Sequence, residues 1–261
     1  VLANSSNNLS VNVKNNGSNA ITSLQMNWND GTDHISTITT NIAAGASQTI
    51  THPIPVSYSA VAQKNIAISI PLVNGAADPV PTDNSGANSI VVISQMTPKK
   101  VFFEEGTGTW CGWCPRGAVA ADYVNTTYPN DQTFVAVHNG DPMVLAEYNT
   151  GAGINSFPGM NVDRVLKAVS ISPTTIGNYV NTRKILATPV NLFGTYSITG
   201  TSMVVNGSAQ FYSNFSNANY RLAAIVTEDG VVGTASGYDQ VNYYSGGGSG
   251  AMGGYESLAN P

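Results

Sequence analysis

The sequence has few charged residues. Asp, Glu, Lys and Arg make up 10% of its 261 residues, against roughly 25% in an average soluble protein. Its polar surface must therefore come from Asn, Ser, Thr and Gly, a composition that is typical of secreted β-rich proteins. The formal net charge is −5, whereas binding to nucleic acid needs a clustered basic face. We therefore expect no nucleic-acid partner.

Long apolar runs are also missing. None approaches the 18 or so residues that span a bilayer as a helix, so we expect no membrane span in this chain. The chain begins with Val1 rather than Met, and we interpret it as a processed mature form or a trimmed chain. The composition favours an extracytoplasmic location: periplasmic, associated with an outer membrane, or secreted.

Only two cysteines are present, Cys111 and Cys114. A secreted protein stapled by disulfides places its cysteines far apart, and a bridge that closes so small a loop constrains the unfolded chain little. The pair is therefore poorly explained as a device for stability. A zinc site needs about four regularly spaced ligands, which one Cys pair and three scattered histidines do not supply. No Gly-rich phosphate loop follows a strand, so we expect neither a metal nor a nucleotide cofactor.

The first part of the chain, residues 1–96, has the pattern of short strands. Apolar and polar residues alternate at 9–13 and again at 66–72, and turn sequences separate such runs. This pattern predicts an antiparallel β-sandwich. The segments 13–17 and 83–88 resemble turns of bacterial immunoglobulin-like, adhesion-related modules. That resemblance implies an all-β immunoglobulin-like sandwich.

The middle part, residues 97–187, has a different pattern. An apolar strand at 101–103 is followed by apolar residues at helical spacing over 115–128 and by a second apolar strand at 133–137. Strand, helix and strand in this order predict an α/β unit with parallel strands. A further helix is expected over 174–186.

The last part, residues 188–261, returns to strand patterns. We expect strands at 190–196, 203–211 and 222–226, and we assign no structure to the Gly-rich segment 246–250. The expected architecture is thus an all-β domain, an α/β domain and a β-rich C-terminal addition that packs on the α/β domain or completes it.

The two cysteines lie between the first strand of the α/β unit and its helix. This placement puts Cys111 at a helix N-terminus, where unpaired N–H groups and the helix dipole favour a thiolate. A thiolate is the attacking species in disulfide exchange. The two intervening residues let Cys114 close on Cys111 and release a mixed disulfide. The spacing therefore predicts a redox-active pair.

The string Trp110-Cys111-Gly112-Trp113-Cys114 resembles the thioredoxin active site, Trp-Cys-Gly-x-Cys. The resemblance implies a thioredoxin-like fold for residues 97–187. It also implies that Cys111 is the exposed nucleophile, that Cys114 is the buried resolving thiol, and that the two form the redox-active disulfide. Trp113 stands where the family usually has Pro, in the dipeptide that tunes the reduction potential.

Two further positions match this family. Glu105 stands where thioredoxins have a buried acidic residue, which implies that it exchanges a proton with Cys114. The alternative is that Glu104 and Glu105 form a solvated strand end. Pro158, in Phe157-Pro158, matches the family's cis-proline, which exposes backbone that pairs with a substrate peptide. The alternative is an ordinary trans turn.

Other residues are candidates for contact with a substrate. We expect the aromatic residues Trp110, Trp113 and Phe157 to bind it. His138 follows the second strand of the α/β unit, and the carboxyl ends of parallel strands carry ligand sites. His138 could therefore steady a thiolate on Cys111 or touch a substrate, and the alternative is a loop-capping histidine. A group of tyrosines near the C-terminus is either a sugar-binding surface or packing: Tyr238, Tyr243, Tyr244 and Tyr255.

A closer resemblance covers most of residues 100–233. The segments 104–117, 157–164 and 228–232 resemble the outer-membrane-associated thioredoxin-like proteins of Bacteroidetes. This resemblance implies a secreted or surface location and a β-rich addition after the thioredoxin-like core.

Two functions remain open at this point. The first is an extracytoplasmic thiol–disulfide oxidoreductase that acts on thiols or disulfides of other proteins, with no cofactor beyond its own cysteine pair. Its sandwich would be a spacer or would bind another surface protein or a glycan. The alternative is a non-catalytic surface or adhesion protein with a locked disulfide.

Overall fold

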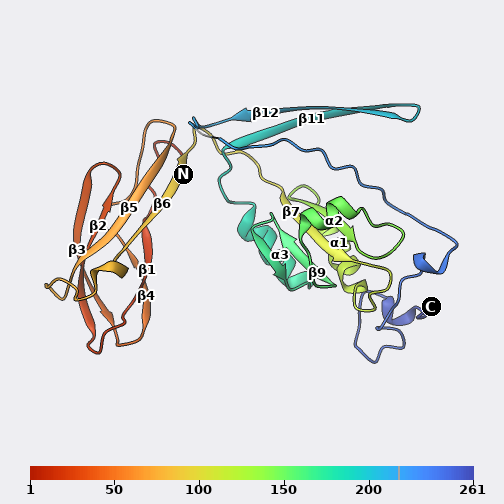
Figure 1. Cartoon of the computed structure of the whole chain (residues 1–261), viewed down its shortest axis with the longest axis horizontal. Helices are drawn as coiled ribbons and strands as arrows, with labels where there is room; N and C mark the ends of the chain where they lie inside the picture. Colours follow the sequence, from red (N-terminus) through yellow and green to blue (C-terminus); the bar gives the residue numbers. More distant parts are fainter. Residues whose placement is uncertain (217) are drawn as a thin grey trace. The chain divides into compact units, whose positions relative to one another are not determined.

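The computed structural model describes residues 1–216 and 218–261. The chain forms two compact units, each built from two stretches of chain (Figure 1). The first unit contains Val1–Thr97 and Ala187–Leu222, and the second contains Pro98–Leu186 and Ala223–Pro261. Residues 188–261 are therefore shared between the two units.

The first unit contains two antiparallel sheets formed by the N-terminal strands. Alternating side chains of the central strand point inward, among them Leu24 and Met26, where they pack with Val13 and Ile50 from the other sheet. This shared core holds the two sheets together. The four-stranded sheet has the order β3-β2-β5-β6 and the two-stranded sheet pairs β1 with β4. The strands are β1 (Ser10–Lys14), β2 (Ile21–Asn29), β3 (Asp33–Ile42), β4 (Ser47–Thr51), β5 (Ala62–Val73) and β6 (Ser85–Val92), with a 3₁₀ turn at Pro81–Asp83.

The second unit is built around one four-stranded sheet with the order β10-β9-β7-β8. Strands β7 and β8 are parallel and are connected through α1, while β9 and β10 run antiparallel to their neighbours. The expected strand–helix–strand connection is therefore present. The elements are β7 (Val101–Thr107), α1 (Pro115–Thr127), β8 (Gln132–His138), α2 (Ala146–Ala152), β9 (Gly159–Val162), β10 (Leu166–Val169) and α3 (Pro173–Arg183).

The two faces of this sheet are covered by different helices. Side chains of β7 alternate between them: Phe103 packs with Val124 of α1 and Ile176 of α3, whereas the other face packs against α2 through Val137 and Ala152. Residues 101, 103, 105 and 107 consequently face α1, the helix that follows the two cysteines.

The C-terminal part has fewer strands than expected. A hairpin pairs β11 (Val190–Thr199) with β12 (Ser202–Phe211). The predicted strand at 222–226 is wrong, because these residues are exposed and take part in no strand pairing. Over 218–261, only 3₁₀ turns at Ser236–Tyr238 and Tyr255–Ser257 interrupt irregular chain. No helix in the described ranges is both long and apolar enough to cross a membrane.

The predicted fold class, with an α/β thioredoxin-like domain, is wrong. The part of the chain that the structure describes is mostly β, with 37% strand, 15% helix and three helices in several small sheets. A thioredoxin-like α/β fold needs more helices. The physical reason is that segments with alternating apolar and polar residues dominate the chain. One strong local motif was used to predict a fold class that most of the residues do not support.

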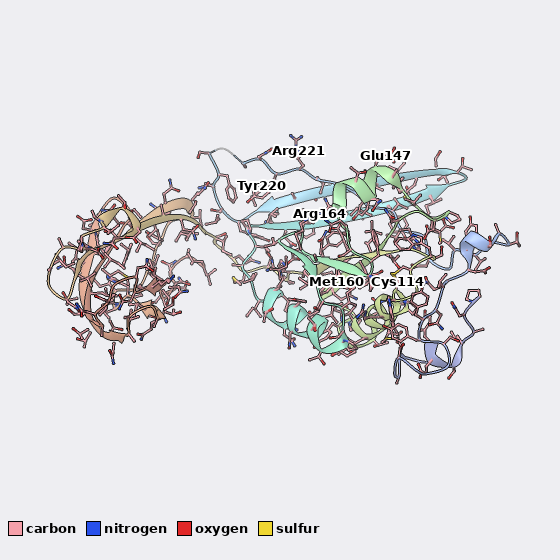
Figure 2. The ribbon with its side chains drawn as sticks, turned by 60° about the horizontal axis from the view of Figure 1, so that its bottom comes forward. Cys114, Glu147, Met160, Arg164, Tyr220 and Arg221 are labelled. Carbon is pink, nitrogen blue, oxygen red and sulfur yellow. A yellow bond between two sulfur atoms is a disulfide. The ribbon has the colours of Figure 1, made fainter. Side chains whose placement is uncertain are left out.

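An ion pair between a buried carboxylate and an exposed arginine stabilises the second unit on the α2 side of the sheet. Glu104 on β7 is fully buried, and both its oxygens accept hydrogen bonds from Arg164, at 2.6–3.1 Å. The hydroxyl of Tyr148 in α2 donates a fourth bond to Glu104, at 2.7 Å. In Figure 2, Arg164 lies beneath α2, the helix that carries Glu147.

We predict that Arg164→Met destabilises the protein by about 2–4 kcal/mol, because it leaves a buried carboxylate without its charged partner. Urea unfolding at neutral pH measures the effect. The matched control is Lys167→Met, which removes an exposed cation three residues away and should cost less than about 0.5 kcal/mol. Equal effects of the two substitutions would contradict this account.

Candidate functional site

The two cysteines lie in the tight turn between β7 and α1. Their sulfurs are at bonding distance, and their Cα atoms are 5.3 Å apart. The backbone N–H of Cys114 donates to the carbonyl of Cys111 at 3.0 Å, and the N–H of Cys111 donates to that of Gly108 at 2.9 Å. The helix itself begins at Pro115, with Cys114 as its N-cap. The expected position at the helix N-terminus therefore belongs to Cys114, and Cys111 precedes it by one turn.

Both cysteines are buried in this disulfide form. Cys111 is 4% exposed and Cys114 is 2% exposed, whereas their neighbours Trp110 and Trp113 are 48% and 43% exposed. The resemblance implied an exposed Cys111, and the disulfide form departs from that expectation. A segment far away in sequence covers it.

This covering segment, residues 240–244, is called the strap below. The N–H of Tyr243 donates to the carbonyl of Gly112 at 2.9 Å, and the side-chain amide of Gln240 donates to that of Cys111 at 2.9 Å. The Tyr243 ring lies so close to Gly112 that a Cβ atom there would be 2.4 Å from it. No sequence pattern predicts this contact apart from the group of tyrosines near the C-terminus, of which Tyr244 is buried packing.

Aromatic side chains flank the cysteine turn on two sides. Trp113 makes edge-to-face contacts with Tyr243 and with another strap tyrosine, at centroid distances of 5.4 and 5.3 Å. Trp110 makes an edge contact with Phe157, at 5.4 Å. The bond between Phe157 and Pro158 is cis. Gly159 pairs with Gly106 near the end of β7, so Pro158 lies at the same end of the sheet as the cysteine turn.

Glu105 is buried next to α1, and the alternative of a solvated strand end is wrong for it. It is 2% exposed, and its Oε1 atom has no hydrogen-bond partner. Gly117 in the first turn of α1 leaves the carboxyl its space, because a Cβ at that position would lie 2.2 Å from Oε1. Burial raises the pKa of Glu105 well above its ordinary value.

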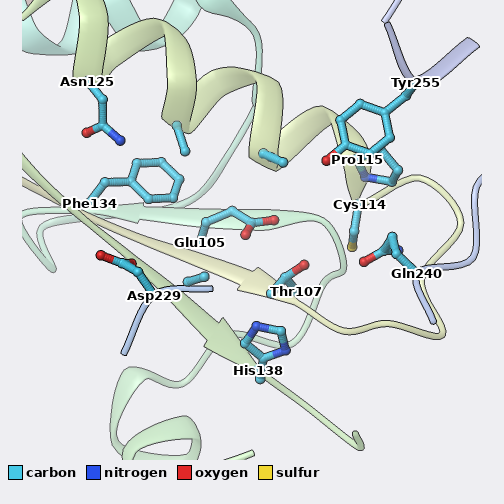
Figure 3. Close-up of a pocket in the computed structure, with 14 residues that line it drawn as sticks. Glu105, Thr107, Cys114, Pro115, Asn125, Phe134, His138, Asp229, Gln240 and Tyr255 are labelled. Carbon is cyan, nitrogen blue, oxygen red and sulfur yellow. The ribbon is translucent and has the colours of Figure 1, made fainter. Parts of the chain in front are cut away.

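Glu105 and Cys114 line one cavity of about 370 Å³ (Figure 3). Figure 3 shows their side chains facing this space together with Thr107 and His138. The cavity is large enough for several water molecules. The cavity therefore connects Cys114, which the resemblance implies is the resolving cysteine, with a carboxyl group that could take its proton.

His138 is paired with an aspartate rather than capping a loop by itself. Its Nδ1 atom lies 2.6 Å from the Oδ2 atom of Asp141. Asp141 also accepts the backbone N–H of Thr109 and that of Met143, each at 3.0 Å, and thereby does the capping. The bond to Thr109 ties this pair to the strand end that leads into the cysteine turn.

Comparison of the chain with protein-family models, with curated proteins and with solved structures found no match. In residues 1–216 and 218–261, no group of three or more His, Cys, Asp or Glu side chains is arranged to hold a metal ion. The chemistry of the site must therefore be argued from its own residues.

We predict that Glu105→Gln stabilises the protein, and increasingly so as the pH rises. The folded-state pKa of Glu105 is raised, so the folded state holds this proton more tightly than the unfolded chain. The free energy of unfolding of the wild type therefore falls as the pH rises from about 4.5 through the folded-state pKa. The fall is about 1.4 kcal/mol for each unit that separates the pKa values of the unfolded and folded states. Glutamine has no charge to bury and lacks this loss.

Urea unfolding of the oxidised protein between acidic and alkaline pH checks this. The control is Glu147→Gln in α2, an exposed carboxylate whose removal should leave the pH profile unchanged. Parallel profiles for wild type and Glu105→Gln would show that the carboxyl is not desolvated as described.

Proposed function

We propose that this chain is a thiol–disulfide oxidoreductase that acts on cysteines of other proteins in an extracytoplasmic environment. One observation supports this most: a cysteine pair at bonding distance shares a cavity with a buried carboxyl group that has an unpartnered oxygen. A structural disulfide has no need of a proton acceptor, whereas disulfide exchange does.

In the proposed reaction, the Cys111 thiolate attacks a substrate disulfide. A bond forms between Cys111 and one substrate sulfur, and the other substrate sulfur leaves as a thiolate that takes a proton from water. Cys114 then gives its thiol proton to the Glu105 carboxylate, and its sulfur attacks Cys111. The intramolecular disulfide forms and the second substrate thiolate leaves. The substrate disulfide gains two electrons and the cysteine pair loses two; the reverse sequence oxidises a dithiol.

The resemblance to outer-membrane-associated proteins of Bacteroidetes supports the proposed location, as does the low content of charged residues. We propose protein thiols or disulfides as the partners. The exposed rings of Trp110 and Trp113 beside the cysteines supply apolar surface on which a substrate chain could rest.

One observation favours the alternative function, a surface protein with a locked disulfide. Cys111 is buried in the turn that the strap contacts, and a sulfur that no thiolate can reach does not exchange. The proposed enzyme therefore requires the strap to move away from Gly112 before a substrate binds.

We predict that Cys114→Ser accumulates a mixed disulfide on Cys111, because the resolving sulfur is missing. Mass spectrometry after incubation with oxidised insulin identifies the adduct. Wild type should catalyse reduction of insulin by dithiothreitol, and Cys111→Ser should lose this catalysis. If wild type and Cys111→Ser give the same rate and no adduct forms, the locked disulfide is the correct interpretation.

We predict that Tyr243→Ala makes the disulfide roughly two- to thirteenfold faster to reduce with dithiothreitol. The substitution removes the aromatic pair with Trp113, worth about 0.5–1.5 kcal/mol, so the strap opens more often. The rate is followed by alkylating the freed thiols. Tyr196→Ala, at an exposed position in β11, is the matched control. An unchanged rate in Tyr243→Ala would mean that the strap does not limit access.

A further inference from the structure

Glu105 can receive a proton from Cys114 but cannot release it to solvent directly, because its side chain is buried. Each turnover must nevertheless return this carboxyl to its ionised form. A titratable group on the same cavity and in contact with solvent would supply the exit. The side chain of His138 meets both conditions: it lines the cavity and is 24% exposed.

The register of the sheet places His138 next to Glu105. Strands β7 and β8 are parallel, with Glu105 beside Ala136 and Thr107 beside His138. Side chains alternate along a strand, so Glu105 and His138 point to the same face, the face covered by α1. Diagonal neighbours of this kind are about 7–8 Å apart along the sheet, so that their long side chains can approach one another or a shared water molecule. Figure 3 shows both side chains on the cavity wall.

The partner of His138 prepares it for this role. The Asp141 carboxylate lies 2.6 Å from Nδ1 and its side chain is 1% exposed, so it holds a proton on Nδ1 and leaves Nε2 free to accept another. Its negative charge then compensates the imidazolium that forms. The other titratable groups on the cavity wall are Asp229 and Tyr255.

We propose that His138, held by Asp141, is a proton-relay residue that carries the proton of Cys114 from Glu105 to solvent. This inference rests on the proposed function and adds a step to it. As Glu105 takes the proton of Cys114, the carboxyl passes a proton through a water to Nε2 of His138, so that the relay acts in the same step as the attack by Cys114. The imidazolium releases a proton to bulk water, and Glu105 is again a carboxylate. No electrons move in this step.

The test follows the two thiols separately. Reduced protein is mixed with excess 5,5′-dithiobis(2-nitrobenzoate) in a stopped-flow instrument. The first coloured thiolate reports attack by Cys111, and the second reports attack by Cys114 on the mixed disulfide. Because the leaving group needs no proton, the second phase isolates the loss of the Cys114 proton.

We expect His138→Gln to slow the second phase at least about tenfold and to leave the first within about twofold. The pH profile of the second phase should differ between the wild type and the variant. His138→Gly should recover rate when imidazole is added to the buffer, which a merely structural role would not produce. Asp229→Asn is the matched control and should behave as wild type.

The two possible failures are distinct. A normal second phase with an unchanged pH profile in His138→Gln would overturn the relay and leave the proposed function standing. So would an effect confined to Asp229→Asn. Absence of a first phase in the wild type would overturn the proposed function, and the relay with it.

Discussion

The burial of an unpartnered carboxyl group is the constraint on which the rest of the site depends. Glu104 and Glu105 are neighbours on β7 and both are buried, but only Glu104 is fully paired, through Arg164 and Tyr148. An ionised Glu105 opposes folding, and Gly117 provides space without providing a donor. Glu105 thus lowers stability and has no structural partner. Such a residue indicates a position at which a chemical role, rather than stability, accounts for the side chain.

The strap imposes a second requirement on the same site. Residues 240–244 hydrogen-bond to the backbone of the cysteine turn, in which Cys111 is buried. Such a cover shields the disulfide from small reductants and restricts which substrates reach it. Hydrogen bonds from Gln240 and Tyr243 hold the strap to the turn and Tyr244 is buried, so opening of the strap must break these contacts without unfolding the whole unit. Disulfide exchange at Cys111 therefore depends on movement of the strap.

Local patterns predicted the parts of the site that are close together in sequence. The turn between β7 and α1, the parallel pair β7–β8 and the cis bond before Pro158 all lie within segments whose spacing or motif carries the information. The fold class could not be predicted from such local patterns, because one motif carries little information about the several small sheets in the rest of the chain. The prediction of a strand at 222–226 was wrong, because alternation alone does not supply a partner strand.

The contacts that sequence analysis missed join residues that are far apart in the sequence. Gln240 and Tyr243 contact the cysteine turn through backbone carbonyls and a glycine, groups that carry no pattern of their own. Asp141 likewise reaches Thr109 across a loop. Periodicity reports which face of an element is buried, but it does not report what lies on that face.

The most direct test of the central claim is the equilibrium potential of the cysteine pair. The oxidised protein is titrated in glutathione and dithiothreitol buffers, and the fraction of free thiols is read by alkylation and mass spectrometry. The account predicts a midpoint between about −270 and −120 mV, the range of pairs that exchange with protein thiols. A pair that stays oxidised below about −300 mV would behave as a structural disulfide and would contradict it.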